Sequence, residues 1–199
     1  MILYLVRHAQ SAANAGVPDA GADSDLTELG VQQAASVGSF LAVRGVDRVL
    51  TSPFLRTLRT AQAICTATGA TGEVCPALRE HHVEQPFPLP PAPWPLLSGE
   101  AIAARLPGLQ VPKSYGDEAS YPVVEADAAV QARVASFLDQ LRADYAAQPE
   151  ARLVLVTHGS PSEKLALSFL GLRWKDGFRT THGNASVTIL ARISQIRLK

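Results

Sequence analysis

The sequence has little cysteine, no net charge and no long apolar run, and each shortage excludes a class of protein. Its 199 residues include two cysteines, Cys65 and Cys75, which are too few and too isolated for a disulfide framework or a zinc site. Lys plus Arg equals Asp plus Glu at 18 each, so no overall positive field attracts nucleic acid or an anionic membrane. We expect neither as a partner, and any basic site must be local.

Targeting and membrane-spanning signals are also missing. Arg7 interrupts the apolar N-terminus too early for a secretory signal, and no later run is long enough to span a bilayer. With both cysteines expected as reduced core residues, a cytoplasmic location is the simplest expectation. Apolar residues make up 47% and charged residues 18%, so we expect a single globular domain over residues 1–199.

Buried strands alternate with amphipathic helices along the chain. Strands are predicted at residues 2–6, 47–52, 152–157 and 184–193, and residues 73–80 are predicted as a strand that runs into a loop. Helices are predicted from an Asp25 N-cap to Gly45, from Ser52 and Pro53 to about Thr68, over residues 125–147, and after a Ser160 N-cap. This alternation predicts an α/β fold, a three-layer sandwich whose mostly parallel central sheet carries helices on both faces.

Residues 81–122 break this pattern. The stretch "EQPFPLPPAPWPLL" contains prolines that exclude a regular helix or a central strand. Long connections of this kind are usually functional lids or mobile linkers, so we expect a Pro-rich, lid-like insertion. A rigid polyproline-like wrap over the surface fits the same composition.

Two of the predicted strands end in histidine, His8 after "LYLVR" and His158 after "LVLVT". Ligands of parallel sheets collect beyond the carboxyl ends of the strands, so we expect both imidazoles in one crevice. Arg7 adjoins His8, and Arg56 lies in the first turns of the second predicted helix. Because helix N-termini and arginine side chains both bind phosphate-like anions, the pattern predicts an anion site.

These residues resemble the histidine phosphatase superfamily, which includes the phosphoglycerate mutases. "RHAQSAAN" is similar to the family's N-terminal signature, "TSPFLRTLRTA" to its second signature, and "LTELGVQQA" to the stretch between them. "LRE" resembles the segment that holds the family's catalytic acid, "LVLVTHG" the segment of its second histidine, and "GNASVTIL" its last strand. The resemblance covers nearly the whole chain except about 81–122, and "HHVEQPF" departs from the family where substrate preference is set.

The resemblance implies a metal-independent phosphomonoesterase that dephosphorylates a small metabolite through a phosphohistidine on His8. Neutral His8 would attack phosphorus, while Arg7, Arg56 and His158 neutralise the phosphate oxygens. Glu80 would protonate the leaving alkoxide and then activate water. No cofactor and no metal are implied. Further phosphate or substrate contacts are expected from Gln10, Ser11, Asn14, Gly159 and His81.

Several alternatives stay open from the sequence. Glu84 is the nearest rival of Glu80 for the acid. A phosphoglycerate mutase, a protein phosphohistidine phosphatase and a non-catalytic phospholigand-binding protein are the competing functions. The chain ends soon after its last predicted strand, without the long C-terminal tail that closes the site of cofactor-dependent mutases, which favours hydrolysis. The insertion favours a covered small-molecule site, and the full set of expected catalytic residues argues against a non-catalytic protein. Oligomeric state is left undetermined.

Overall fold

A mostly parallel sheet forms the centre of the molecule. The computed structural model describes residues 1–81, 96–116, 124–172 and 180–191. Within these ranges the strands are β1 (Ile2–Arg7), β2 (Arg48–Thr51), β3 (Thr71–Val74), β4 (Leu109–Gln110), β5 (Arg152–Thr157) and β6 (Val187–Ala191). Their order across the sheet is β4-β3-β2-β5-β1-β6, and every neighbouring pair is parallel except β1 with β6. The predicted sheet type is confirmed.

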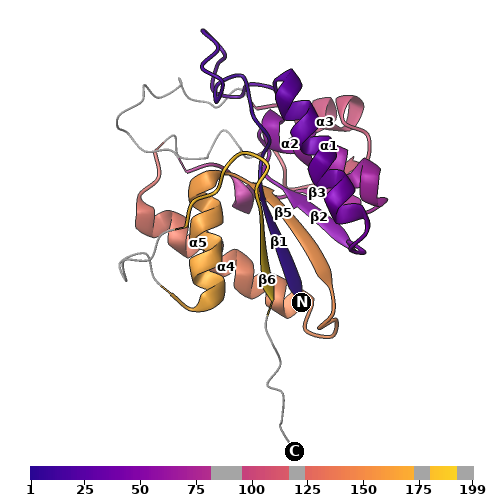
Figure 1. Cartoon of the computed structure of the whole chain (residues 1–199). Coiled ribbons are helices and arrows are strands. Elements are labelled where there is room, and N and C mark those ends of the chain that lie inside the picture. Colours follow the sequence, from indigo (N-terminus) through magenta and orange to yellow (C-terminus); the bar gives the residue numbers. More distant parts are fainter. Residues whose placement is uncertain (82–95, 117–123, 173–179, 192–199) are drawn as a thin grey trace, which may run out of the picture.

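Helices cover both faces of this sheet, as predicted (Figure 1). One face carries α1 (Glu28–Ala42), α2 (Leu55–Thr68) and α3 (Gly99–Arg105), and the other carries α4 (Asp127–Asp144) and α5 (Gly159–Leu170). Helix α4 presents the predicted apolar face of Val130, Val134, Leu138 and Leu141, all of which are buried. No helix within the described ranges is long and apolar enough to cross a membrane.

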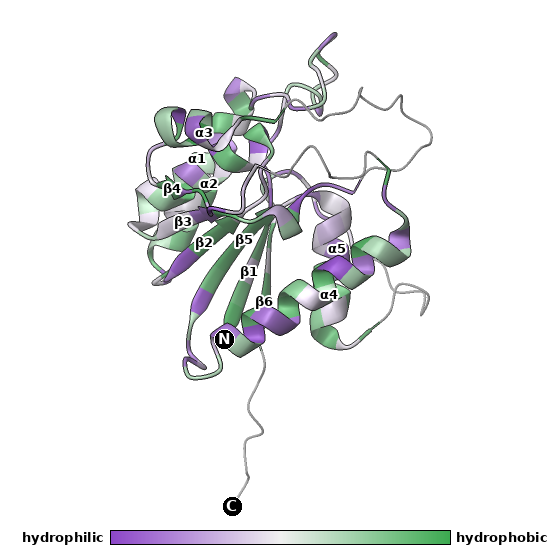
Figure 2. Cartoon of the chain, turned by 180° about the vertical axis from the view of Figure 1, so that it is seen from behind, coloured by the Kyte–Doolittle hydropathy of each residue, from purple (hydrophilic) through white to green (hydrophobic). Residues whose placement is uncertain are grey.

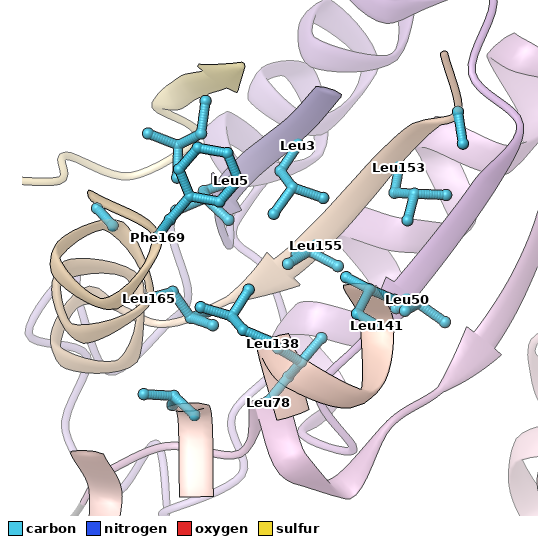
Figure 3. Packing of buried hydrophobic residues seen from close by; sticks show 14 of the residues in the cluster. Leu3, Leu5, Leu50, Leu78, Leu138, Leu141, Leu153, Leu155, Leu165 and Phe169 are labelled. Carbon is cyan, nitrogen blue, oxygen red and sulfur yellow. The ribbon is translucent and has the colours of Figure 1, made fainter. Parts of the chain in front are cut away.

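The inner strands are apolar on both sides because both sides are covered. Leu3 and Leu155 pack into the cluster beneath α4 and α5, part of which is shown in Figure 3. Tyr4 and Val154 pack into the second cluster, beneath α1 and α2. Figure 2 shows the hydrophobic colouring of these inner strands. Two-sided burial explains the continuous aliphatic runs in the sequence.

The sheet topology brings three strand ends together. Strand β5 lies between β2 and β1, with Thr157 opposite Arg7 and Val156 opposite Thr51. The chain segments that follow these strands therefore leave the sheet side by side at its carboxyl edge. This edge is where parallel sheets bind their ligands.

Two predicted helix N-caps are wrong because a neighbouring residue takes the role. Helix α1 begins at Glu28 with Thr27 as N-cap, and the Thr27 hydroxyl accepts from the Gly30 N–H at 3.0 Å. The Asp25 carboxylate instead accepts from the N–H of Leu26. Helix α5 begins at Gly159, so the predicted cap Ser160 lies in its first turn.

The start of α2 is also two residues later than predicted. Phe54 is the N-cap, and Ser52 directs its hydroxyl at His158 rather than at the helix. The Leu55 N–H is satisfied by the Asp23 carboxylate at 2.7 Å, which is 32 positions away in the sequence. A distant side chain has replaced the local cap, and local sequence patterns do not reveal such a partner.

The third predicted strand is present, and the loop that was expected to follow it begins with a short helix. Strand β3 ends at Val74, and Pro76–Leu78 form a short 3₁₀ helix, because Pro76 has no N–H with which to continue a sheet ladder. The range 81–122 also contains structure that its prolines did not predict, namely α3 and the edge strand β4. The most Pro-rich part, 82–95, lies outside the described residues, so the expected lid remains a prediction.

Candidate active site

Four side chains converge at the carboxyl edge of the sheet. His8 follows β1, His158 follows β5, Arg56 lies in the first turn of α2, and Glu80 follows the 3₁₀ helix. The two imidazole ring centroids are 5.2 Å apart. The two histidines that follow the strand ends therefore lie together, as expected.

His8 is buried and its tautomer follows from its partners. Its Nδ1 lies 2.8 Å from the carbonyl oxygen of Ala9, which can only accept a hydrogen bond, so Nδ1 carries the proton. The Nε2 lone pair is then available, and the Arg56 Nε–H points at it from 3.3 Å. Burial, followed by the charges of His158 and Arg56, holds the pKa of His8 well below its ordinary value. A neutral imidazole with a fixed proton is the form that a nucleophile requires.

Arg56 links the members of the cluster. Its Nη2 lies 3.2 Å from Nδ1 of His158 and 3.6 Å from a carboxylate oxygen of Glu80, and its Nη1 donates to the Ala22 carbonyl at 3.1 Å. Burial lowers the pKa of this guanidinium, and the neighbouring carboxylates of Glu80 and Asp23 oppose that effect. Arginine stays charged in such a setting, so the site holds a fixed cation.

His158 is fully buried and has a polar partner at each ring nitrogen. Its Nε2 lies 2.8 Å from the Ser52 hydroxyl, and its Nδ1 lies 3.2 Å from Oε2 of Glu80. Ser52 is itself held in place, since its carbonyl accepts from the hydroxyls of Thr51 and Thr57. The imidazole is therefore fixed from both sides, which keeps its proton-bearing nitrogen directed at the carboxylate.

Glu80 is an ionised carboxylate in this environment. Burial acts to raise the pKa of Glu80, but the charge and hydrogen bond of His158, the charge of Arg56 and the His81 N–H outweigh it. The net effect holds the pKa of Glu80 well below its ordinary value. The side chain keeps 19% of its surface exposed, so one edge of the carboxyl group can meet a ligand.

The cluster fits an anion better than a metal ion. One atom each of His8, Glu80 and His158 lie within 4.8 Å of one another, a separation that a metal could bridge. However, the Arg56 guanidinium lies within 3.3 Å of a ring nitrogen of each histidine, so its positive charge would repel a metal ion bound between them. A phosphate-sized anion gains from the same charges that repel a cation.

Arg7 lies beside the start of α5. Its Nη1 donates to the His182 carbonyl at 2.6 Å, while its Nε is buried and hydrogen-bonds to no described atom. A Cβ atom at Gly159 would lie 3.8 Å from that Nε, so the guanidinium packs against the first residue of the helix. The unpaired N–H groups of the first helical turn add to this positive surface.

The residues Gln10, Ser11 and Asn14 form a tight turn after the first histidine. The Ser11 hydroxyl donates to the Asn14 side-chain oxygen at 3.2 Å, which also accepts from Asn184. Asn184 in turn donates to the His8 carbonyl at 3.3 Å. The Gln10 side chain accepts from the Thr27 hydroxyl at the start of α1. This turn supports the backbone of His8, and its expected contact with substrate remains a prediction.

His81 is engaged by protein atoms on both ring nitrogens. Its Nδ1 lies 2.9 Å from the Ser160 hydroxyl, and its Nε2 lies 2.9 Å from the carbonyl oxygen of Glu125. Its expected role in binding substrate is therefore a prediction that competes with these contacts. Glu84, the rival of Glu80, lies outside the described residues.

Three residues of the site were missed by the sequence analysis. Ser52 was interpreted as a helix cap, and Asp23 and Glu125 were not singled out. Asp23 caps α2 next to Arg56, and Glu125 pairs with Arg133 and Arg79 beneath the loop that carries the acid. All three act on partners far away in the sequence or in another element, and no local pattern marks such contacts.

Comparison with protein families gives one match over nearly the whole chain. The family described as Histidine phosphatase superfamily (branch 1) matches residues 3–195. A probable phosphoglycerate mutase GpmB of Erwinia tasmaniensis is 43% identical over 79 residues, which cover 39% of this chain and 37% of that protein. The match thus spans well under half the length of that curated relative.

Solved structures share the fold over most of the chain. A mycobacterial glucosyl-3-phosphoglycerate phosphatase complexed with VO3 is 27% identical, with a TM-score of 0.67, and the match covers 96% of this chain and 90% of that one. The ecdysone phosphate phosphatase of Bombix mori in complex with tungstate has a TM-score of 0.74 at 16% identity, and covers 94% of this chain and 88% of its own. The second likeness shows the fold alone.

Proposed function

The chain belongs to the histidine phosphatase superfamily, and from this premise we propose that it is a metal-independent phosphomonoesterase acting on a small phosphorylated metabolite. The observation that carries the proposal is the state of His8. Its Nδ1 proton is fixed on a carbonyl, and its Nε2 lone pair faces a buried guanidinium. A phosphate held by that guanidinium would lie directly against the nucleophilic nitrogen.

In the first step, His8 Nε2 attacks phosphorus and the bond from phosphorus to the leaving alkoxide breaks. Charge on the transferring phosphoryl oxygens is neutralised by Arg7, Arg56 and His158. The similar mycobacterial phosphatase forms a complex with VO3, which supports an oxyanion pocket of this kind.

Glu80 supplies the proton that the alkoxide needs. A phosphate dianion between Arg56 and His158 takes up the positive charge that otherwise keeps the Glu80 carboxyl ionised, which raises its pKa and lets it carry a proton. In the second step the carboxylate accepts a proton from water, water attacks the phosphohistidine, and inorganic phosphate leaves. The enzyme returns to its starting state with no other co-reactant.

A phosphoglycerate mutase is the alternative, and the names of the curated relatives favour it over the matched 79 residues. A mutase returns the phosphoryl group from His8 to a bound product, whereas a phosphatase gives it to water. The two functions therefore differ in whether inorganic phosphate or an isomeric phosphoester accumulates.

A panel of phosphorylated metabolites, assayed with EDTA for both inorganic phosphate and isomeric products, tests the proposal. We expect phosphate release that His8→Ala lowers by at least about a thousandfold, since removal of a nucleophile abolishes the two-step route. Intact-protein mass spectrometry after an alkaline quench should detect a phosphoryl adduct on the wild type and none on His8→Ala. Activity lost on adding EDTA, or a variant that keeps more than a few per cent of activity, would contradict the mechanism.

A further inference from the structure

Lys164 is a buried charge that the proposed reaction does not use. Its side chain is 1% exposed, although an ammonium loses several kcal/mol of solvation on burial. Its Nζ lies 3.0 Å from the Ser160 hydroxyl, one turn earlier in α5, and 2.9 Å from the Asp127 carboxylate at the start of α4. Asp127 keeps 57% of its side chain exposed, so only the lysine bears the full cost of burial.

A series of hydrogen bonds leads from Lys164 to the loop that carries Glu80 and His81. The Ser160 hydroxyl lies 2.9 Å from His81 Nδ1, and His81 Nε2 lies 2.9 Å from the carbonyl oxygen of Glu125. The backbone N–H of His81 donates to Oε1 of Glu80 at 2.9 Å. His81 is thus held in place by the hydrogen bonds of its ring, and its main-chain N–H in turn binds Glu80, the proposed catalytic acid.

The chemical groups at the two ends of this series of hydrogen bonds decide which atom donates in each of them. An ammonium can only donate, so Lys164 donates to the Ser160 oxygen and leaves the hydroxyl proton for His81 Nδ1. A carbonyl can only accept, so His81 Nε2 carries the ring proton. With Lys164 in place, the hydroxyl proton faces His81 Nδ1 and the ring proton lies on Nε2, although the Asp127 carboxylate lies 3.8 Å from Nδ1 as well.

We propose that Lys164 is a positioning residue for the acid: it sets the direction of the hydrogen bonds through Ser160 to His81, and thereby fixes the His81 N–H on the Glu80 carboxylate. The role in catalysis rests on the proposed function. The clamp on His81 does not, and can be measured separately. Without the lysine, the Ser160 hydroxyl no longer has to donate, so it can accept from a proton on His81 Nδ1, which the Asp127 carboxylate 3.8 Å from that nitrogen favours, and the loop that carries Glu80 gains freedom.

The variant Lys164→Met tests this proposal because it keeps most of the buried volume and removes the charge. A lysine with only a structural role predicts a lower melting temperature and an unchanged reaction. A positioning lysine predicts the opposite. Replacement of a buried ion by an apolar residue should leave the melting temperature equal or higher, since the remaining Asp127 carboxylate is solvated. The kcat for alkyl phosphates should fall by roughly tenfold, with KM and the kcat for p-nitrophenyl phosphate little changed.

Two further variants keep the test decisive. Ser160→Ala removes the hydroxyl that links Lys164 to His81 and leaves the buried charge in place. It should therefore give the same selective loss of kcat for alkyl phosphates, even if Lys164→Met folds poorly. The double variant should lose no more than either single one, because both remove one unit. Arg142→Met removes a charge from an exposed ion pair with Asp139 on α4 and serves as the control, with no change expected.

A measurement without turnover separates this inference from the function itself. Nitrogen NMR shifts of the His81 ring should report one tautomer, protonated at Nε2, in the wild type, and a mixture in Lys164→Met and Ser160→Ala. A protein without phosphatase activity but with these shifts would refute the function and leave the clamp standing. An unchanged tautomer in both variants, or equal losses for alkyl and p-nitrophenyl esters, would overturn the proposal.

Discussion

The two sides of the site are held by different kinds of interaction. On the phosphate side, the backbone of His8 and Ser52 hydrogen-bonds directly to β5, through the carbonyls of Thr157 and Val156. On the acid side, Glu80 lies in a loop that follows the short 3₁₀ helix, whose Leu78 packs in the same cluster as Leu138 of α4 (Figure 3). The phosphate side is therefore part of the sheet, whereas the acid side is docked onto it.

Arg133 of α4 contributes hydrogen bonds and an ion pair to that docking. Arg133 donates to the carbonyls of Ala77 and Arg79, at 2.6 and 3.2 Å, and pairs with both carboxylate oxygens of Glu125. Arg79 binds the same carboxylate from the loop itself, at 2.9 Å. Sheet topology fixes the phosphate side and charged side chains fix the acid side. Substitutions on the two sides should therefore impair the reaction in different ways.

The largest effect is expected on the phosphate side, at Arg56. The variant Arg56→Ala should lower kcat/KM by about a thousandfold for every ester, because it removes a buried donor that stabilises the transferring phosphoryl group. Arg56→Lys should recover only part of the loss, because a point charge cannot reproduce the fork geometry. Steady-state kinetics with alkyl and aryl phosphates measure both.

Arg59 is the matched control for this prediction. It lies one turn further along α2, is 37% exposed and pairs with Asp25 at 3.4 Å. Arg59→Ala should keep nearly full activity. Equal losses at the two positions would mean that the anion does not lie at the start of α2.

On the acid side, Glu80→Gln should discriminate between leaving groups. Hydrolysis of alkyl phosphates should fall by about a hundredfold, while p-nitrophenyl phosphate, whose phenolate leaves with little help, should be affected far less in the first step. Water activation is lost as well, so a phosphohistidine should accumulate and be detected by mass spectrometry. Arg56→Ala, in contrast, should lower the hydrolysis of alkyl phosphates and of p-nitrophenyl phosphate to the same extent.

Glu84→Gln is the control for the acid, because Glu84 is the rival carboxylate in the sequence. It should leave the leaving-group dependence unchanged. Selective loss in Glu84→Gln rather than in Glu80→Gln would move the acid role to the rival residue.

The same contrast explains what the sequence could predict. The meeting of His8 and His158 follows from two parallel strands that both end in histidine, and Arg56 remains in the first turn of α2 although the helix starts later than predicted. These features depend on topology and on periodicity, which single sequences express.

The remaining features depend on long-range partners. Ser52 and His158 are 106 positions apart, and Glu125 reaches back 46 positions to Arg79. A serine before a proline looks the same whether its hydroxyl caps a helix or binds a buried imidazole. The acid side was therefore the harder side to predict, because its geometry depends on side-chain pairs rather than on strand order.

Glu125→Gln should weaken the acid side through stability. Burial acts to raise the pKa of Glu125, but Arg133 and Arg79 outweigh it and hold that pKa below its ordinary value of 4.5. A lowered folded-state pKa contributes stability that is present above pH 4.5 and lost as pH falls through the folded value. The variant should lose about 2 kcal/mol in free energy of unfolding at pH 7, because two arginines lose their charged partner. Denaturant titrations at pH 7 and pH 4 should show this difference shrinking at the lower pH, and a constant difference would contradict it.

The smallest expected effect has the opposite sign and lies on the phosphate side, at Asp23. Burial raises the pKa of Asp23 from 3.8 to about 6, although the Leu55 N–H and the charge of Arg56 oppose this. A raised folded-state pKa contributes stability that is fully present below pH 3.8 and is lost as pH rises through about 6. Asp23→Asn keeps an oxygen that can accept from Leu55 and removes the buried charge.

We therefore expect Asp23→Asn to be more stable than the wild type by about 1 kcal/mol at pH 8, a value discounted because an amide is the weaker acceptor. The two proteins should converge near pH 4, where the wild-type carboxyl is protonated in the folded state. Denaturant titrations from pH 4 to 8 measure both proteins. A wild type that exceeds Asp23→Asn in stability at pH 8 would mean that the Asp23 charge supports Arg56 by more than its burial costs.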